Sequence, residues 1–185
     1  MNAKYFFVSA VAVSALVVYF SFRQKDRSPK IKDVILIGGL DNRKGDKTLS
    51  EQKILLQQGF THPINIIAFR YNDTKSALEY IRTKPNTRIV LFSAGCSVSK
   101  EVAEILKSNR ESLNHLYIVE PYHSEGKTTK SVQAAVRLGV PTKNVLVGAY
   151  SASGMGIVEN ARPTPKCTPN HWCSLTEVGK IINTK

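Results

Sequence analysis

Ser93 is the residue whose type and position most clearly suggest chemistry. It follows an apolar run at 88–92 that predicts a buried strand, and it precedes an Ala-Gly-Cys turn and then a helical pattern. On a sharp turn between a strand and a helix, small neighbours allow a serine to present its hydroxyl as a nucleophile. The simpler interpretation is a tight turn whose serine caps the following helix. The local sequence alone leaves both interpretations open.

A nucleophilic serine needs a general base and an acid that orients the base, and two residues stand where they could serve. Glu120 follows a β-branched run that predicts the next strand, and Pro121 comes directly after it. His171 lies just before the last amphipathic segment. The plain alternatives are a solvated acid at a strand end and a surface histidine. His123 competes with His171 for the role of base. The acids that could replace Glu120 are Asp73, Glu125 and Glu159.

The chain has three cysteines, Cys96, Cys167 and Cys173. Three do not make a disulfide framework, but Cys167 and Cys173 are near enough in sequence to pair across a short loop, which would imply an oxidising compartment. With His171 they could also be read as zinc ligands. No further ligand pair at a familiar spacing accompanies them, so we predict neither a metal nor a cofactor. Cys96 could act as a nucleophile only if the register of the turn were shifted by three residues.

Short β-branched runs alternate with amphipathic segments along the rest of the chain, which predicts a parallel sheet covered by helices on both faces. The predicted fold class is α/β, a three-layer α/β/α arrangement with a mainly parallel sheet of about five strands. In such a sheet, functional residues lie beyond the carboxyl ends of the strands. Capping boxes are expected at Thr48–Glu51 and at Ser174–Glu177. The predicted strands are 33–37, 64–69, 88–92, 115–119 and 144–148, and the predicted helices are 48–58, 74–83, 97–108, 128–138 and the segment from 174 onward.

The turn at Ser93 resembles the nucleophile turn of the α/β-hydrolase family, whose pattern is Gly-x-Ser-x-Gly. Leu91 stands where that family has its first glycine. The apolar run that ends in Gly38-Gly39 is similar to the strand and loop that usually read His-Gly in hydrolases, with Gly38 in place of the histidine. The resemblance covers residues 32–185. It implies that the backbone N–H groups of Leu40 and Ala94 form an oxyanion hole.

The resemblance also covers the order of the reacting groups. Hydrolases of this family carry nucleophile, acid and base in that order, which corresponds here to Ser93, Glu120 and His171. In pancreatic-type lipases the acid follows the next strand and precedes a proline, as Glu120 does. The implied reaction is acyl transfer, in which His171 removes the proton from Ser93, Ser93 attacks an ester carbonyl, and water releases the acyl-enzyme.

Residues 5–22 contain no Asp, Glu, Lys, Arg or His and are about long enough to cross a bilayer as a helix. A buried core helix and a cleaved signal peptide are the alternatives. We predict a signal anchor at 1–22, a basic linker at 23–32 and an α/β-hydrolase-like domain at 33–185. The basic residues that follow the anchor favour a cytoplasmic domain on a single-pass membrane protein.

The net charge of +12 would be compatible with nucleic-acid binding, but part of it belongs to the linker and the rest is scattered among acids. We therefore expect no nucleic-acid partner. The leading functional hypothesis is a membrane-anchored serine hydrolase that cleaves a carboxylic ester, with lipid or other surface-bound esters as substrates. The alternative is a noncatalytic α/β-hydrolase-like domain that acts as a membrane-tethered binding module, which Leu91 and Gly38 would favour.

Overall fold

A computed structural model describes residues 31–41, 47–121, 127–148, 160–163 and 171–184. Residues 32–185 form one compact unit, separate from residues 1–31. The predicted anchor at 5–22 lies outside the described residues. In the part of the chain that the structure describes, no helix is long and apolar enough to cross a bilayer.

The compact unit is built on a parallel sheet of six strands in the order β2-β1-β3-β4-β5-β6. The chain leaves β1 in one direction to form β2, then crosses back over β1 to form β3 and continues outward. The carboxyl ends of β1 and β3 therefore flank the point where the direction of winding reverses, which is where open α/β sheets bind ligands. The strands are β1 (Asp33–Ile37), β2 (Asn65–Phe69), β3 (Arg88–Phe92), β4 (Leu116–Val119), β5 (Val145–Val147) and β6 (Arg162–Pro163).

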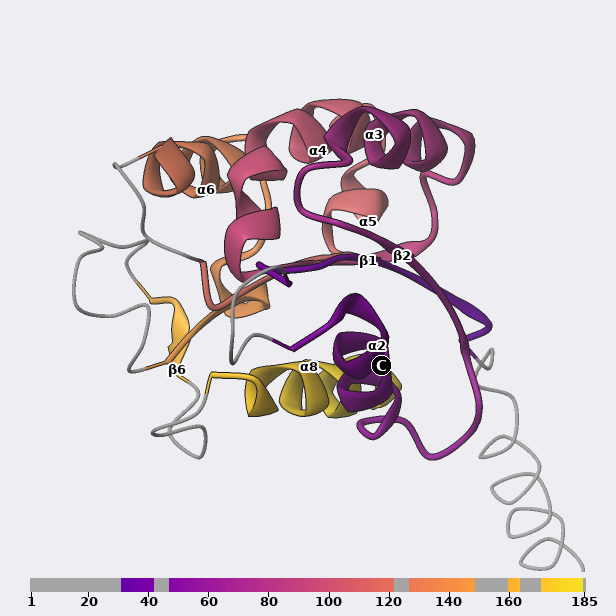
Figure 1. Ribbon diagram of the computed structural model, residues 1–185. Helices are drawn as coiled ribbons and strands as arrows, with labels where there is room; N and C mark the ends of the chain where they lie inside the picture. The colour runs from indigo at the N-terminus through magenta and orange to yellow at the C-terminus, as the bar shows by residue number, and fades with distance from the viewer. Residues whose placement is uncertain (1–30, 42–46, 122–126, 149–159, 164–170, 185) are drawn as a thin grey trace, which may run out of the picture. The chain divides into compact units, whose positions relative to one another are not determined.

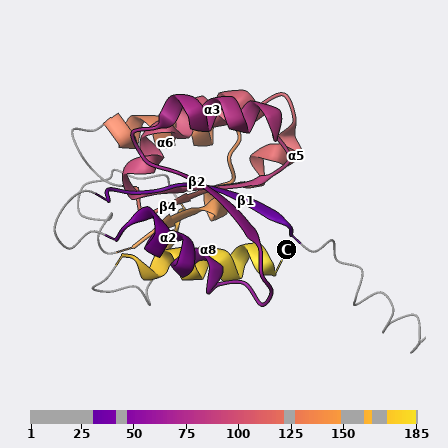
Figure 2. The ribbon, with the colours of Figure 1, turned by 45° about the vertical axis from the view of Figure 1, so that its right-hand side comes forward.

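Helices cover both faces of the sheet, as Figures 1 and 2 show, with α3, α4, α5 and α6 above it and α2 and α8 below it. This arrangement confirms the predicted α/β class with a parallel sheet between two helix layers. The helices are α2 (Leu49–Gln57), α3 (Thr74–Thr83), α4 (Ser99–Leu106), α5 (Arg110–Leu113), α6 (Lys127–Arg137) and α8 (Cys173–Asn183), with 3-10 turns η1 (Ser93–Val98) and η2 (Thr142–Asn144).

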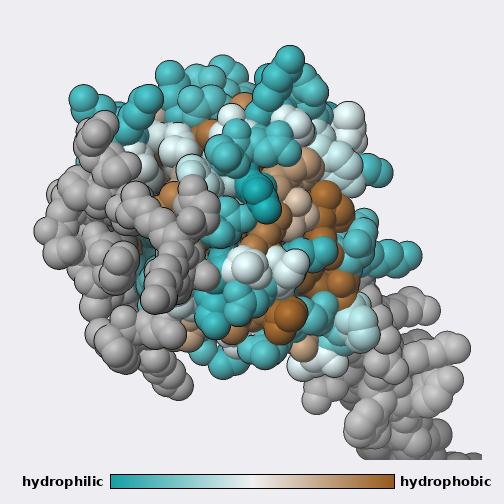
Figure 3. Space-filling model, in the orientation of Figure 1, coloured by the Kyte–Doolittle hydropathy of each residue, from teal (hydrophilic) through white to brown (hydrophobic). Residues whose placement is uncertain are grey.

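The upper helix layer and the sheet enclose a large apolar core. Alternate strand residues such as Ile35, Ile89 and Ile118 enter it, because successive side chains of a strand point to opposite faces. The amphipathic helices contribute Ile81 and Leu106, among others. Their outer faces are largely hydrophilic in Figure 3, where the upper edge of the molecule is mostly teal. Burial of this apolar surface is the main force that holds the upper layer to the sheet.

The lower helices, α2 and α8, pack closely against each other. A side chain at Gly59 would meet the backbone of Thr176 and Gly179, and one at Gly179 would come within 2.6 Å of the carbonyl oxygen of Leu56. The Thr176 hydroxyl donates a hydrogen bond to the carbonyl oxygen of Leu55, at 2.9 Å. Two glycines thus allow α8 to lie directly against α2.

Several sequence-based predictions need correction. The helix expected at 97–108 is shorter, because residues 97 and 98 belong to η1 and α4 ends at Leu106; the short helix α5 that follows was not predicted. The sixth strand, β6, was not predicted, because two residues are too few to show a periodic pattern. The capping box of Thr48 and Glu51 is confirmed at the start of α2. The one expected at Ser174 is wrong, because α8 begins at Cys173 and Ser174 lies inside the helix.

Candidate active site

Ser93 and Glu120 both have a left-handed backbone conformation. Among the described non-glycine residues, only Ser93 (φ 53°), Glu120 (φ 46°) and Asn160 (φ 68°) have positive φ angles. Such angles are unfavourable for L-residues and tend to occur at functional sites, where the surrounding structure enforces them. Two of the three residues are therefore those that the sequence suggested as nucleophile and acid.

The register of the sheet brings these two residues to the same level. Phe92 of β3 pairs with Val119 of β4, so Ser93 and Glu120 are the first residues beyond two adjacent strands. Ser93 begins η1, whereas the N–H of Glu120 donates to the carbonyl oxygen of Leu146 in β5, at 2.8 Å. The chain therefore turns directly after β3 and directly after β4, at paired positions of the two strands.

The loop after β1 lies directly against Ser93. Ile37 pairs with Leu91, which brings Gly39 opposite Ser93. A Cβ atom on Gly39 would lie 2.8 Å from the Cβ of Ser93 and 3.2 Å from its Oγ, so only glycine fits at this position without displacing the serine. The exposed fraction of Ser93 is 5%, so the residue is packed more tightly than the open position that its sequence context suggested.

Gly95 allows the turn that follows Ser93 to lie close to the end of β1. A Cβ atom on Gly95 would collide with the carbonyl oxygen of Ile37 and lie 2.7 Å from that of Gly38. The close approach of two backbones therefore explains the glycines at 39 and 95. A nucleophile on a strand-turn-helix junction would need small neighbours of this kind.

Gln52 of α2 holds the glycine loop in place. The side chain is fully buried; its Oε1 accepts a hydrogen bond from the N–H of Gly39 at 2.9 Å, and its Nε2 donates to the carbonyl oxygen of Lys47 at 2.8 Å. A buried amide with both ends bonded is costly to disturb, because either loss leaves a polar group unsatisfied. Gln52 therefore fixes the segment that continues into Leu40, the predicted oxyanion donor.

An ion pair joins the far end of this loop to the neighbouring strand. The Nε of Arg70 lies 3.2 Å from Oδ2 of Asp41, and the Asp41 side chain is 7% exposed. The N–H of Gly38 donates to the carbonyl oxygen of Phe69 at 2.9 Å. The loop after β1 is thus bound on one side by α2 and on the other by the end of β2.

Glu120 is a buried carboxylic acid that is held by the last helix. It is 3% exposed, and its Oε1 accepts a hydrogen bond from the hydroxyl of Ser174 at 2.9 Å. The prediction that Ser174 caps the helix is therefore replaced by a different role, that of positioning Glu120. Pro121, directly after Glu120, is also buried.

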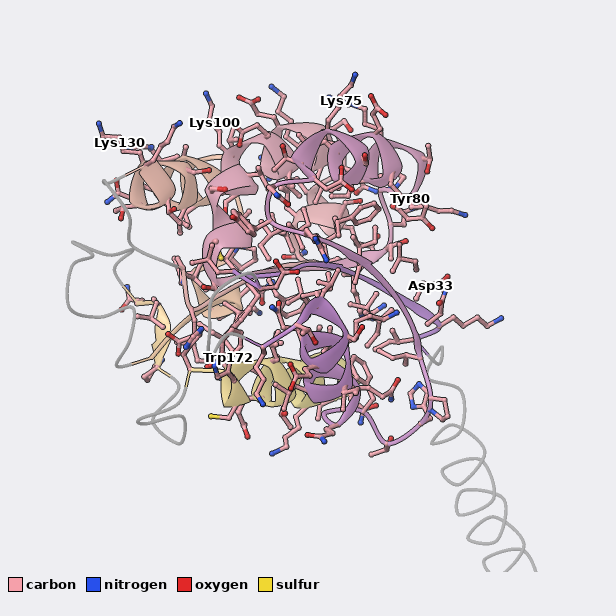
Figure 4. The ribbon with its side chains drawn as sticks, viewed as in Figure 1. Asp33, Lys75, Tyr80, Lys100, Lys130 and Trp172 are labelled. Carbon is pink, nitrogen blue, oxygen red and sulfur yellow. The ribbon has the colours of Figure 1, made fainter. Side chains whose placement is uncertain are left out.

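His171 lies at the start of α8 and packs on the residue that precedes Ser93. Its ring stacks on that of Phe92, with centroids 5.3 Å apart and an angle of 12° between the planes. Trp172 completes the cluster, with its ring 4.3 Å from that of His171 and 5.4 Å from that of Phe92. Figure 4 labels Trp172 below the sheet, at the start of α8.

The structure thus brings all three predicted residues to the carboxyl edge of β3 and β4. Ser93 and Glu120 end adjacent strands, and His171 is attached to the same edge through its stacking on Phe92. The hydrogen bond from Ser174 to Glu120 binds the first turn of α8 to the same place. Leu40 and Ala94 are half-buried residues in the adjoining segments.

Cys96 lies beneath this edge as a buried free thiol. Its Sγ contacts the carbonyl oxygens of Leu91 and Val119 at 3.2 and 3.5 Å, and so links β3 to β4. Burial raises the pKa of the thiol well above its ordinary value, which opposes formation of the reactive thiolate. Cys96 is therefore a packing residue and not a competing nucleophile.

Cys173, the first residue of α8, is disulfide-bonded. This agrees with the pairing that the sequence left open, although Cys167 lies outside the described residues. The alternative base His123 and the alternative acids Glu125 and Glu159 also lie outside them. Asp73 is exposed at the start of α3. No group of three potential metal ligands occurs among the residues that the structure describes.

Gln52 and Ser174 contact the candidate site in ways that sequence reasoning missed. Each lies on a helix, and each reaches a loop or strand end far away in sequence, so no local pattern reveals the contact. The one available signal for Gln52 is a polar residue on the otherwise apolar, buried side of α2.

Comparisons with protein-family models, curated proteins and solved structures find no match to this chain.

Proposed function

We propose that the domain is a serine hydrolase that cleaves a carboxylic ester through an acyl-enzyme on Ser93. The observation that carries the proposal is the left-handed backbone of Ser93 at the end of β3, pressed against Gly39. A capping serine needs no such conformation, because an N-cap residue has extended backbone angles. A strained serine between a strand and a helix is the geometry of a nucleophile turn.

In the proposed reaction, His171 takes the proton of Ser93 and later returns it to the leaving alcohol. Glu120 orients the imidazole and stabilises its charged form, while Ser174 keeps the carboxylate in place. The N–H groups of Ala94 and Leu40 stabilise the oxyanion. The bond from Gly39 to Gln52 supports this assignment, since it occupies the N–H of Gly39 and fixes the segment that carries Leu40.

A fluorophosphonate probe tests this proposal, because it reacts covalently with an activated serine. The wild-type chain should be labelled, Ser93→Ala should not, and Ser76→Ala, which removes an exposed serine of α3, should be labelled at the wild-type rate. Absence of labelling in a wild-type protein with a cooperative unfolding transition would refute the hydrolase. It would favour the noncatalytic binding module, which is supported by the fully buried Leu91 in place of the family's glycine.

We further propose that residues 5–22 tether the domain to a membrane and that its substrates are lipid or other surface-bound esters. The tether raises the local concentration of the enzyme at that surface. Full-length protein should therefore hydrolyse a vesicle-embedded ester faster than the compact unit 32–185 does, while both hydrolyse a soluble ester equally. Equal rates of the two proteins on the vesicle-embedded ester would contradict the proposal.

Two features favour opposite sides of the membrane for this domain. The basic linker favours the cytoplasm, whereas the disulfide at Cys173 favours an oxidising compartment. Protease protection of the full-length protein in sealed, right-side-out cells or spheroplasts separates the two. Digestion by external protease would place the domain outside the cytoplasm, and protection that is lost on lysis would place it inside.

A further inference from the structure

A surface pocket lies on the opposite face of the sheet from α8, the helix that begins next to His171 and Trp172. A pocket of about 540 Å³ opens between η1 and the start of α4 on one side and the start of α6 on the other. This volume is in the range of small-ligand sites. Its lining residues are Ser97, Val98, Lys100, Glu101, Lys127, Lys130, Ser131 and Ala134.

The lining is strongly basic. Lys100, Lys127 and Lys130 line the pocket together with one acid, Glu101, and the other lining residues are uncharged. Lys100 is also 3.8 Å from Glu104, but both of these side chains are about half exposed, so the pair neutralises little of the charge. Figure 4 shows Lys100 and Lys130 on neighbouring helices of the upper layer, with Lys75 farther along that layer.

These lysines occupy positions that a helix does not favour. Lys127 and Lys130 lie in the first turn of α6, which contains no acidic residue, and Lys100 lies in the first turn of α4 beside Glu101. The amino end of a helix is the positive end of its dipole, so cations there are repelled and anions are attracted. Lys127 and Lys130 are also three residues apart on one helix face, where like charges repel. A bound anion would relieve all of these repulsions.

The framework of the pocket is fixed by a hydrogen bond between its two sides. The backbone N–H of Lys100 donates to the hydroxyl oxygen of Ser131 at 2.9 Å, and Ser131 is 9% exposed. Because the oxygen accepts this bond, the hydroxyl proton of Ser131 can be donated to a ligand. Two helix starts, three lysines and a hydroxyl donor thereby border one space.

We propose that this pocket binds a phosphate group. Lysine ammonium groups are compact point charges suited to phosphate, and helix amino ends are favourable sites for the same anion. The phosphate belongs either to a soluble phosphorylated molecule or to an anionic lipid headgroup. This proposal does not depend on the hydrolase activity, because no lining residue belongs to the proposed catalytic group.

Calorimetric titration of the full-length chain, in an uncharged detergent that contains no phosphate, tests the site with inorganic phosphate as the probe. The double substitution K127Q/K130Q should weaken binding by about tenfold or more, since it removes two of three charge-assisted contacts. E101Q should strengthen binding, because it removes a like-charged neighbour. A matched control, K75Q/K107Q, makes the same change in net charge on exposed residues outside the pocket and should leave the affinity unchanged within about twofold.

Three results would overturn the proposal. These are the absence of phosphate binding to the wild-type protein, equal weakening in the pocket and control variants, and wild-type affinity in K127Q/K130Q. Because all substituted lysines are exposed, thermal unfolding should show that the variants fold normally. Repeating the titration with phosphatidylglycerol or phosphatidylcholine in the micelles identifies the source of the phosphate. Competition by phosphatidylglycerol alone indicates a lipid headgroup, and no competition indicates a soluble ligand.

Discussion

The two helix layers differ in what they bring to the sheet. The upper layer of α3, α4 and α6 contributes mainly aliphatic side chains to a continuous apolar core. The lower layer of α2 and α8 inserts polar side chains at the carboxyl edge, where Gln52 binds Gly39 and Ser174 binds Glu120. We infer that the upper layer chiefly stabilises the fold and the lower layer chiefly positions the candidate site.

This division explains why the strained residues can persist. Left-handed angles at Ser93 and Glu120 oppose folding by about 1–3 kcal/mol each, and they require surroundings that permit no relaxed alternative. The apolar core provides general stability, whereas the bonds from the lower helices fix the particular conformation. The two contributions can be separated by mutation.

The largest expected effect is that of Glu120→Gln. This change keeps the size of the side chain but removes the charge that stabilises an imidazolium, so the rate of fluorophosphonate labelling should fall by about 10³- to 10⁴-fold. Circular dichroism should show an intact fold. Glu79→Gln, on the exposed face of α3, is the control and should react at the wild-type rate. If Glu159→Gln caused the loss instead, the acid would be wrongly assigned.

Leu106→Ala probes the upper layer. Leu106 is 1% exposed within the apolar core, and its truncation should lower the free energy of unfolding by about 2–5 kcal/mol. Urea denaturation measures this loss. The labelling rate of the remaining folded protein should equal that of the wild type. A folded variant with a strongly reduced labelling rate would show that the upper layer also positions the site.

Gln52→Leu probes the lower layer, with Gln57→Leu as its matched control on the same helix. Both glutamines make two side-chain hydrogen bonds to backbone atoms, but those of Gln57 go to His62 and Ile64, near the opposite end of the sheet. Both changes should destabilise the protein, Gln52→Leu by more, because Gln52 is fully buried and Gln57 only partly. Only Gln52→Leu should lower the labelling rate, by about a hundredfold, because it releases the proposed oxyanion segment. Equal labelling rates would remove Gln52 from the site.

The smallest effect concerns the start of α2. Hydrogen bonds from the backbone N–H and the hydroxyl of Thr48 lower the pKa of Glu51 below its ordinary value of 4.5. The charged form is therefore favoured in the folded state, and its contribution to stability is present above pH 4.5 and is lost as the pH falls below it. Unfolding curves of wild type and Glu51→Gln should converge on acidification. A gap that is constant with pH would show that the charge is not responsible.

The sequence was most informative where local pattern determines structure. The strands at 33–37 and 88–92 were predicted with their observed bounds, because β-branched runs that end in small residues indicate buried strands. Ser93 and Glu120 could be identified as candidates because strand ends are where parallel sheets place functional groups. Their left-handed angles could not be predicted, because the packing of other segments enforces them.

Long-range contacts account for what the sequence did not reveal. Ser174 followed by Glu177 has the spacing of a capping box, yet Ser174 bonds to Glu120, 54 residues away. The stacking of His171 on Phe92 likewise depends on how α8 is placed against the sheet. Such contacts are set by tertiary packing, which overrides a local signal.

The proposed hydrolase activity requires that the turn after β3 makes Ser93 a nucleophile. The most direct measurement is to react the full-length protein with a fluorophosphonate, digest it, and locate the adduct by peptide mass spectrometry. We expect one adduct per molecule, on Ser93, and none when the protein is denatured before labelling. An adduct on any other residue, or none on a natively folded protein, would contradict it.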